Sequence, residues 1–109
     1  PVSRIELIDT DQLAERMEQN GKTVVLDVRD TDEYERAHIP GSVHIPFGEL
    51  PERHGELPRD VPIAAICSGG KRSGLGASIL QREGFESVLH VANGGVGTWE
   101  RDGRPVEKS

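Results

Sequence analysis

Residues 63–74 read IAAICSGGKRSG, and this stretch is the most informative segment of the sequence. Its apolar part predicts a buried strand over residues 62–66 that ends just before Cys67, and a helix is predicted to begin near Ser73. Open α/β sheets bind their ligands at the carboxyl ends of the strands. Cys67, the single cysteine of the chain, is therefore expected at a ligand site.

The rest of the chain also alternates short β-branched runs with polar helical stretches, which is typical of a parallel sheet covered by helices. Further strands are predicted over residues 5–8, 23–28, 42–45 and 87–91. Helices are predicted from residue 10 to near Gly21, over residues 31–37 and 73–83, and around Trp99. The helix over residues 73–83 is expected to turn Leu75, Ile79 and Leu80 inward and to end at Gly84. Residues 47–62 hold three prolines and two glycines, so a loop with at most a turn or two of helix is predicted there.

Length and composition limit the organisation of the chain. With 109 residues it is long enough for one compact domain and short for two, so residues 1–109 are expected to form a single domain. Hydrophobic residues make up 34% and aromatic residues 4%, which predicts a core of Val, Ile, Leu and Ala side chains. Because the chain begins at Pro1, an upstream segment is expected to have been removed.

The net charge of -6 is unevenly distributed. Residues 1–50 hold 11 acidic against 5 basic side chains, and residues 51–109 hold 8 of each. An acidic surface repels phosphate backbones and anionic lipid headgroups, so the chain is expected to bind neither nucleic acid nor membranes. A lone cysteine, the lack of an apolar run of about 18 residues and the lack of a signal-peptide pattern favour a cytoplasmic protein.

The residues that follow Cys67 favour its thiolate form. Gly69 and Gly70 allow backbone conformations in which successive N–H groups turn inward as an anion-binding nest. The start of the helix adds a partial positive charge, and Lys71 and Arg72 add full ones. A free thiol has a pKa of about 8.5, which falls by several units in such surroundings, so Cys67 is predicted to be a nucleophile. The alternative interpretation is a buried, inert cysteine, but that would need none of these features.

Three other kinds of site do not fit the spacing. A nucleotide-binding P-loop needs a glycine where Ala65 stands and a hydroxyl residue where Arg72 stands. A zinc site needs clustered ligands, whereas the histidines show no pairing at three to five residues and are interpreted as structural or surface residues. These are His38, His44, His54 and His90. No serine or histidine lies in the context of a hydrolase triad, and neither a metal nor a cofactor is expected.

The loop Cys67-Ser68-Gly69-Gly70-Lys71-Arg72 resembles the C-x-x-G-x-R active-site loop of the rhodanese-like sulfurtransferases. Other segments resemble motifs of that family in the same order: VLDVR at 25–29, EY at 33–34, HIPGS at 38–42, IP at 45–46, NGG at 93–95, Trp99, Gly103 and PV at 105–106. The resemblance covers residues 24–106 and implies a three-layer α/β/α sandwich around a five-stranded parallel sheet. It also implies a catalytic Cys67, substrate binding by Ser68, Gly69, Gly70, Lys71, Arg72 and Ser73, and structural support from Asp27, Arg29, His38 and Trp99.

Two features depart from the family pattern. Ala37 stands where the family has a glycine before His38. Gly74 and Gly76 lie in the first turns of the helix after the loop, where each costs about 1 kcal/mol of helix stability relative to alanine. The cysteine loop is therefore expected to be less rigid than the family pattern implies, because the helix that follows it is less stable.

The resemblance implies sulfur transfer. The Cys67 thiolate would take the outer sulfur of a small anion, such as thiosulfate or a persulfide, and pass it to cyanide, a thiol or an acceptor protein. With no second cysteine, the acceptor must be external. One alternative is a cysteine-dependent phosphatase or arsenate reductase of related fold, in which five residues rather than four separate the cysteine from the arginine. The other is a non-catalytic docking module, against which the retained Cys67 and Arg72 argue.

Overall fold

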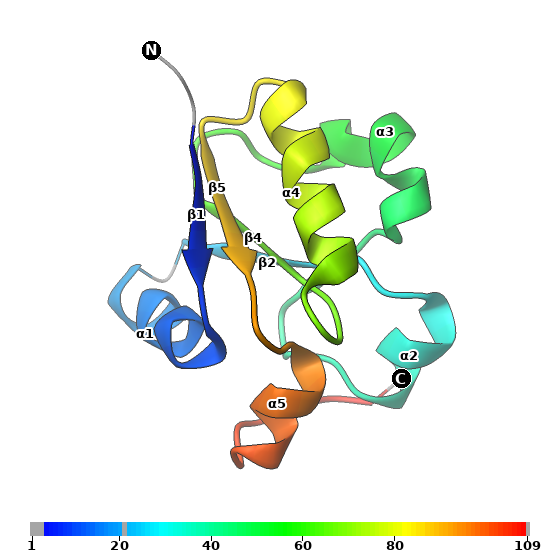
Figure 1. Ribbon diagram of the computed structural model, residues 1–109. Coiled ribbons are helices and arrows are strands. Elements are labelled where there is room, and N and C mark those ends of the chain that lie inside the picture. Colours follow the sequence, from blue (N-terminus) through cyan, green and yellow to red (C-terminus); the bar gives the residue numbers. More distant parts are fainter. Residues whose placement is uncertain (1–3, 21, 109) are drawn as a thin grey trace.

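Five parallel strands form a sheet through the middle of the molecule (Figure 1). The computed structural model describes residues 4–20 and 22–108. The strands are β1 (Arg4–Ile8), β2 (Val24–Asp27), β3 (Val43–His44), β4 (Ile63–Ile66) and β5 (Ser87–Val91). Their order across the sheet is β1-β5-β4-β2-β3, and each neighbouring pair is parallel. The predicted fold class, α/β with a five-stranded parallel sheet, is confirmed.

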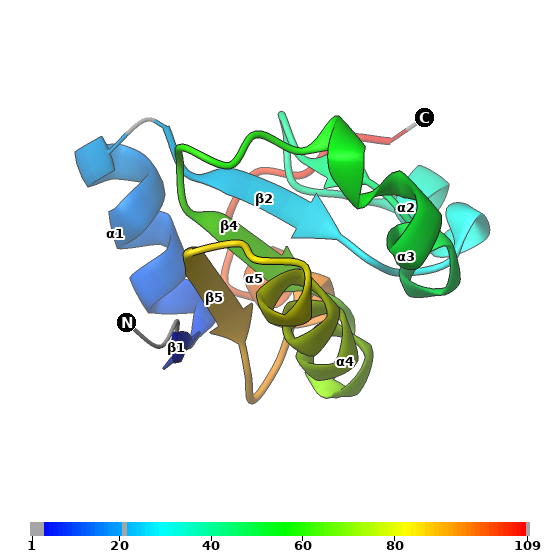
Figure 2. The ribbon, with the colours of Figure 1, turned by 90° about the horizontal axis from the view of Figure 1, so that it is seen from above.

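Helices cover both faces of this sheet. They are α1 (Thr10–Asn20), α2 (Thr31–Arg36), α3 (Leu50–Arg53), α4 (Lys71–Arg82) and α5 (Val96–Arg101), and the 3-10 turns η1 (Phe47–Glu49) and η2 (His54–Glu56) flank α3. Helices α3 and α4 lie on one face and α1 and α5 on the other, as Figure 2 shows. The predicted end of the first helix, near Gly21, lies outside the described residues. None of the described helices is long and apolar enough to cross a membrane.

The core has two parts, one on each face of the sheet. Alternate residues of β4 divide between them, with Ile63 and Ala65 on the side of α4 and Ala64 and Ile66 on the side of α1 and α5. All four are fully buried, as expected of a central strand covered on both faces. Aliphatic side chains dominate both parts, as the composition predicts.

The helix after the cysteine differs from its prediction in two respects. It begins at Lys71, two residues earlier than predicted, and Gly70 is its N-cap with a φ of 98°. Leu75, which is predicted to point inward, is instead 51% exposed. Ser73 and Ala77 are buried on the inner face of α4. Leu75 is two positions from each of them, and in a helix with 3.6 residues per turn this spacing places it on the opposite, outer face.

Candidate active site

The loop that follows β4 encloses the sulfur atom of Cys67. Cys67 is 1% exposed, and its Sγ accepts hydrogen bonds from the backbone N–H groups of Gly70 (3.1 Å) and Ser73 (3.3 Å). Gly70 caps α4 and Ser73 lies in its first turn, so Sγ stands at the helix N-terminus. The partial positive charge of that terminus favours an anion at this point.

The Ser73 hydroxyl completes the surroundings of the sulfur. Its Oγ lies 3.4 Å from Sγ of Cys67 and 3.3 Å from the carbonyl oxygen of Val91, so it can donate a hydrogen bond to either. Burial raises the pKa of the Cys67 thiol. Hydrogen bonds from the Ser73 hydroxyl and from the N–H groups of Ser73, Gly70 and Gly69 outweigh burial and leave the pKa below its ordinary value. The loop therefore favours the thiolate, which is the nucleophilic form of cysteine.

His90 of β5 holds the peptide group that follows Gly70. Its Nε2 lies 2.8 Å from the carbonyl oxygen of Gly70, a contact in which Nε2 carries the proton and donates. A Cβ at Gly74 would lie 3.1 Å from Cε1 of His90, so the glycine leaves room for this ring. A Cβ at Gly76 would lie 3.3 Å from Cγ1 of Val28. The two helix glycines therefore have a packing role, because they let the ring and the valine approach α4 closely.

The segment before α5 closes the loop from the other side. The N–H of Val96 donates a hydrogen bond of 3.0 Å to the carbonyl oxygen of Cys67. Gly95 lies against the same carbonyl group, and a Cβ there would be 1.7 Å from the Cys67 oxygen and 2.8 Å from the Ser68 oxygen. Only a residue without a side chain fits this approach.

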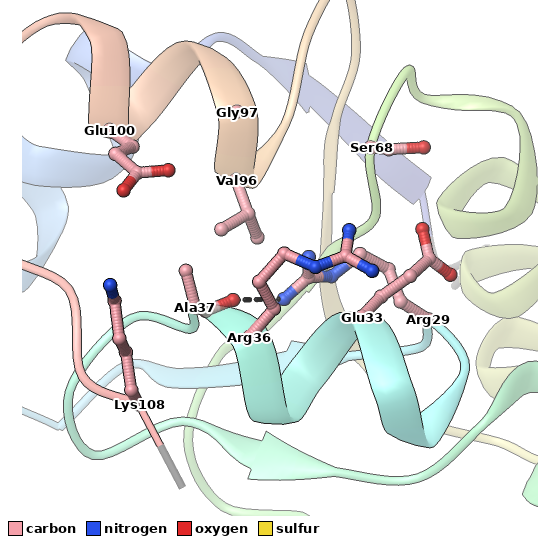
Figure 3. Close-up of a pocket in the computed structure, with 9 residues that line it drawn as sticks. All are labelled: Arg29, Glu33, Arg36, Ala37, Ser68, Val96, Gly97, Glu100 and Lys108. Atoms are coloured by element: carbon pink, nitrogen blue, oxygen red, sulfur yellow. Dashed lines mark hydrogen bonds between the residues drawn. The ribbon is translucent and has the colours of Figure 1, made fainter.

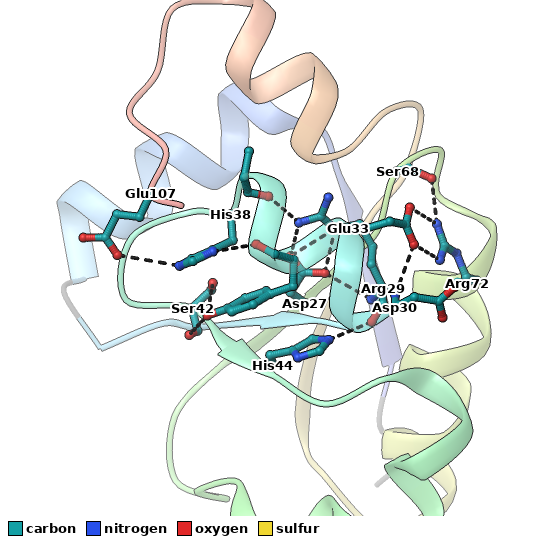
Figure 4. A network of polar contacts seen from close by, with 12 residues as sticks. Asp27, Arg29, Asp30, Glu33, His38, Ser42, His44, Ser68, Arg72 and Glu107 are labelled. Atoms are coloured by element: carbon teal, nitrogen blue, oxygen red, sulfur yellow. Dashed lines mark hydrogen bonds and ion pairs between the residues drawn. The ribbon is translucent and has the colours of Figure 1, made fainter. Parts of the chain in front are cut away.

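Arg72 ties the loop to α2 (Figure 4). Its guanidinium donates to both carboxylate oxygens of Glu33, at 2.6 and 3.1 Å, and to Oγ of Ser68 at 2.8 Å. Glu33 also accepts a hydrogen bond of 3.1 Å from the N–H of Asp30. The hydrogen bond from Arg72 is the main cause that lowers the pKa of Glu33 to about 2, so this side chain is a carboxylate at neutral pH. Lys71, the other cation of the loop, is exposed.

A buried ion pair lies where β2 ends. Asp27 and Arg29 are at most 6% exposed, and hydrogen bonds of 2.7 to 3.1 Å join the carboxylate to the guanidinium. Nη2 of Arg29 also donates to the carbonyl oxygen of Ala37 at 2.7 Å. The carbonyl oxygen of Arg29 lies 2.8 Å from Nε2 of His44. The pair thus connects the end of β2 with the segment after α2 and with β3.

His38 and Trp99 contact the segment that follows α5. The His38 ring stacks on Tyr34 with 3.9 Å between ring centroids, and its backbone exchanges hydrogen bonds of 2.9 and 2.7 Å with Glu107. Trp99 is buried, and its Nε1 donates to the carbonyl oxygen of Pro105 at 2.8 Å. These contacts join residues 105–107 to the rest of the molecule.

A cavity of about 440 Å³ opens beside the cysteine loop (Figure 3). Its lining residues are Arg29, Glu33, Arg36, Ala37, Ser68, Val96, Gly97, Glu100 and Lys108. Ser68, which directly follows the cysteine, connects the cavity with the loop. Three of the lining side chains are cationic and two are anionic, so the cavity suits a small charged ligand better than an apolar one.

The structure places Cys67 and the following six residues next to one another: residues 68–70 form the turn after β4, and Lys71, Arg72 and Ser73 form the first turn of α4. That Ser68, Gly69, Gly70, Lys71, Arg72 and Ser73 bind substrate stays a prediction. Sequence reasoning does not assign Glu33, His90 or Gly95 to the site. His90 carries a signal, because it is a polar residue near the end of a predicted strand, whereas Glu33 and Arg72 are 39 residues apart and no local pattern links them. Within the described ranges, no group of three or more His, Cys, Asp or Glu side chains could hold a metal ion.

Fold and site together define a class of α/β proteins in which a cysteine at the carboxyl end of a parallel strand is surrounded by backbone N–H groups of the loop and helix that follow it. The chain belongs to the rhodanese-like domain family, because the model of the rhodanese-like domain matches residues 9–102.

Three known proteins illustrate the relationship. The chain is 39% identical over 92 residues to YrkF of Bacillus subtilis, which is named as a candidate sulfur carrier protein; the match covers 84% of this chain and 50% of YrkF. It is 29% identical to a sulfurtransferase of Allochromatium vinosum, with 91% of this chain and 92% of that protein covered. The crystal structure of a rhodanese-related protein from Thermoplasma volcanium superposes with a TM-score of 0.83 at 33% identity, covering 95% of this chain and 99% of that one. The chain thus spans about half the length of YrkF and nearly the whole length of the other two.

Proposed function

We propose that this chain is a sulfurtransferase that carries one sulfane sulfur atom as a persulfide on Cys67. The observation that carries the proposal is the enclosure of Sγ by the N–H groups of Gly70 and Ser73 at the start of α4. Relatives that are named for sulfur transfer and sulfur carriage support it.

In the first step the Cys67 thiolate attacks the outer sulfur of a donor such as thiosulfate. The S–S bond of the donor breaks, sulfite leaves with the bonding electron pair, and a Cys67 persulfide anion remains. Because Cys67 is almost fully buried, the donor sulfur has to pass into the cysteine loop to reach Sγ. The N–H groups that stabilise the thiolate would also stabilise the terminal sulfur of the persulfide.

In the second step a thiophilic acceptor attacks the terminal sulfur, and the Cys67 thiolate leaves. The chain has no second cysteine that could resolve the persulfide, so the acceptor is external: cyanide, a thiol or an acceptor protein. Substrate binding is assigned to the residues of the loop, which are Ser68, Gly69, Gly70, Lys71, Arg72 and Ser73. The cavity that Ser68 lines gives an acceptor room beside the cysteine loop.

Intact mass spectrometry tests the proposal. Incubation with thiosulfate should add one sulfur atom, about 32 Da, and cyanide should then remove it as thiocyanate. Cys67→Ser should abolish the adduct, and Ser78→Ala, at an exposed position of α4, is the matched control that should retain it. An adduct that persists in Cys67→Ser would show that the sulfur is carried elsewhere.

The same protein can be tested for the alternative chemistry. Four residues separate Cys67 from Arg72, one fewer than in the related phosphatases, so hydrolysis of aryl phosphates is expected to stay at background. Clear aryl phosphatase activity that depends on Cys67 would reverse this ranking of the two functions.

A further inference from the structure

Arg72, one of the two cationic residues of the cysteine loop, is already paired with a carboxylate. Both terminal nitrogens of Arg72 contact the carboxylate of Glu33, and one of them also contacts Oγ of Ser68. The Arg72–Glu33 pair is about three-quarters buried on each side. Charge-assisted, bidentate pairs of this kind are among the stronger hydrogen-bonded contacts in proteins. An anion that approaches the loop therefore meets an arginine whose charge is largely balanced.

Other charges near the mouth of the loop do not restore a strong positive field. Asp30 adds a further negative charge that acts on Arg72. In the adjoining cavity Arg29 is paired with Asp27, and the remaining charged lining residues are Arg36, Glu100 and Lys108. Lys71 is exposed, so solvent and salt screen its charge. Glu33 thus combines proximity to the loop, a fixed negative charge and a place in the cavity wall.

We propose that Glu33 determines which sulfur donors the loop accepts, so that donors with a single negative charge, such as thiosulfonates and persulfides, are favoured over the dianion thiosulfate. This inference rests on the proposed sulfur transfer at Cys67. Glu33 acts on the donor through its charge and through its hold on Arg72, and it has no part in bond breaking. It is a specificity-determining residue rather than a catalytic one.

Thiosulfate and methanethiosulfonate form a matched pair of probes. Each presents an outer sulfur bonded to a sulfonyl sulfur, and each transfers that outer sulfur to the Cys67 thiolate as the S–S bond breaks. Sulfite leaves from thiosulfate and methanesulfinate leaves from methanethiosulfonate, in both cases with the bonding electron pair. The two donors differ mainly in charge, because thiosulfate is a dianion and methanethiosulfonate a monoanion.

The test compares the rates of persulfide formation from the two donors in Glu33→Gln and in the wild-type protein. Glutamine keeps the length of the side chain, and its Oε1 can still accept the hydrogen bonds from the Asp30 N–H and from Nη1 of Arg72. It has no charge, and its NH2 group cannot accept the second hydrogen bond of Arg72. Coulomb energy is proportional to charge, so the gain with thiosulfate should be about the square of the gain with methanethiosulfonate: about tenfold against about threefold. Raising the salt concentration should reduce both gains.

Two variants on α2 serve as controls. Glu35→Gln removes the same charge from an exposed position of the helix and should leave the ratio of the two rates unchanged. Glu33→Asp keeps the charge and should keep the ratio close to that of the wild-type protein. If Glu33→Gln does not fold, as judged by its melting temperature, Glu33→Met provides a second uncharged side chain of similar length.

The possible outcomes separate this inference from the proposed function. If neither donor loads sulfur onto Cys67 of the wild-type protein, the proposed function fails. If both donors load Cys67 but removal of the Glu33 charge leaves the ratio of rates unchanged, the inference about Glu33 is wrong and the proposed function stands. An equal gain with both donors would also overturn the inference, because it would show a loosened loop rather than an effect of charge.

Discussion

Gly95 is the position where one added methyl group tests the arrangement of the site most directly. In Gly95→Ala the new Cβ would lie 1.7 Å from the carbonyl oxygen of Cys67 and 2.6 Å from its carbonyl carbon. An ordinary contact begins at 3.4 Å, so the two segments would have to separate by about 1.7 Å, the difference between 3.4 and 1.7 Å. Both neighbours are backbone atoms, so a change of side-chain rotamer cannot relieve the overlap.

This separation would break the hydrogen bond from Val96 to Cys67 and displace the loop. Overpacking costs about 1–3 kcal/mol and a lost hydrogen bond about 1 kcal/mol, so the free energy of unfolding should fall by about 2–4 kcal/mol. For a domain of this size Tm should fall by on the order of 10 °C. A displacement of about 1 Å in an active site can reduce a rate by about a hundredfold, and we expect sulfur uptake by Cys67 to slow by that order.

Calorimetry and timed intact-mass measurements of sulfur uptake check the two effects separately. Gly55→Ala is the matched control, because a Cβ at Gly55 would meet no atom within 4 Å. This control should keep the wild-type Tm and the wild-type rate. If Gly95→Ala also kept both, the close approach of Gly95 to the Cys67 carbonyl would not constrain the site, and the reasoning would be refuted.

Three further changes test other contacts of the site. His90→Phe removes the donor to the Gly70 carbonyl; the pH profile of Cys67 alkylation by iodoacetamide should move to higher pH and sulfur uptake should slow by about threefold to tenfold, whereas an unchanged profile would contradict this role of His90. Asp27→Ala leaves Arg29 buried without its partner and should cost about 3–5 kcal/mol in urea unfolding, so a loss below about 1 kcal/mol would count against the ion pair as a structural support. The pKa of Glu33 is about 2 in the folded protein and 4.5 in its ordinary state, so the unfolded chain binds more protons between these values. The contribution of the ionised Glu33 to the free energy of unfolding, on the order of 1–3 kcal/mol, should be complete above about pH 4.5 and lost as the pH falls toward 2. The difference in urea midpoint between the wild-type protein and Glu33→Gln should therefore shrink over this range, and a constant difference would contradict the role of the Glu33 charge.

The sequence predicts the sheet well because each strand is marked locally. Strand β4 is apolar along its whole length and β2 is apolar up to its last residue, Asp27, which is the pattern of strands covered on both faces. The prediction that Leu75 points inward is wrong, because the hydrophobicity of a side chain does not by itself determine which face of α4 is buried. Ser73 contacts Sγ of Cys67 through its N–H group and is buried on the inner face of α4. Leu75 therefore lies on the outer face of the helix and is exposed.

The site is predictable only in its local part. Cys67, the two glycines after it and the start of α4 are neighbours in sequence, so their joint effect on the thiolate can be inferred without a structure. The contact of Glu33 with Arg72 depends on how α2 lies against the loop, and the contact of His90 with Gly70 depends on the pairing of β4 with β5. Such contacts follow from the three-dimensional arrangement, and no spacing along the chain reveals them.

Cys67 is both buried and surrounded by hydrogen-bond donors, and the two conditions exist together only in the folded chain. In the unfolded chain it is an ordinary, accessible thiol with a pKa of about 8.5. A bulky thiol reagent at mildly alkaline pH would therefore label unfolded molecules, whereas a slim sulfane donor would load folded ones. One cysteine thus reports both populations of the folding equilibrium, through two reagents that differ in size.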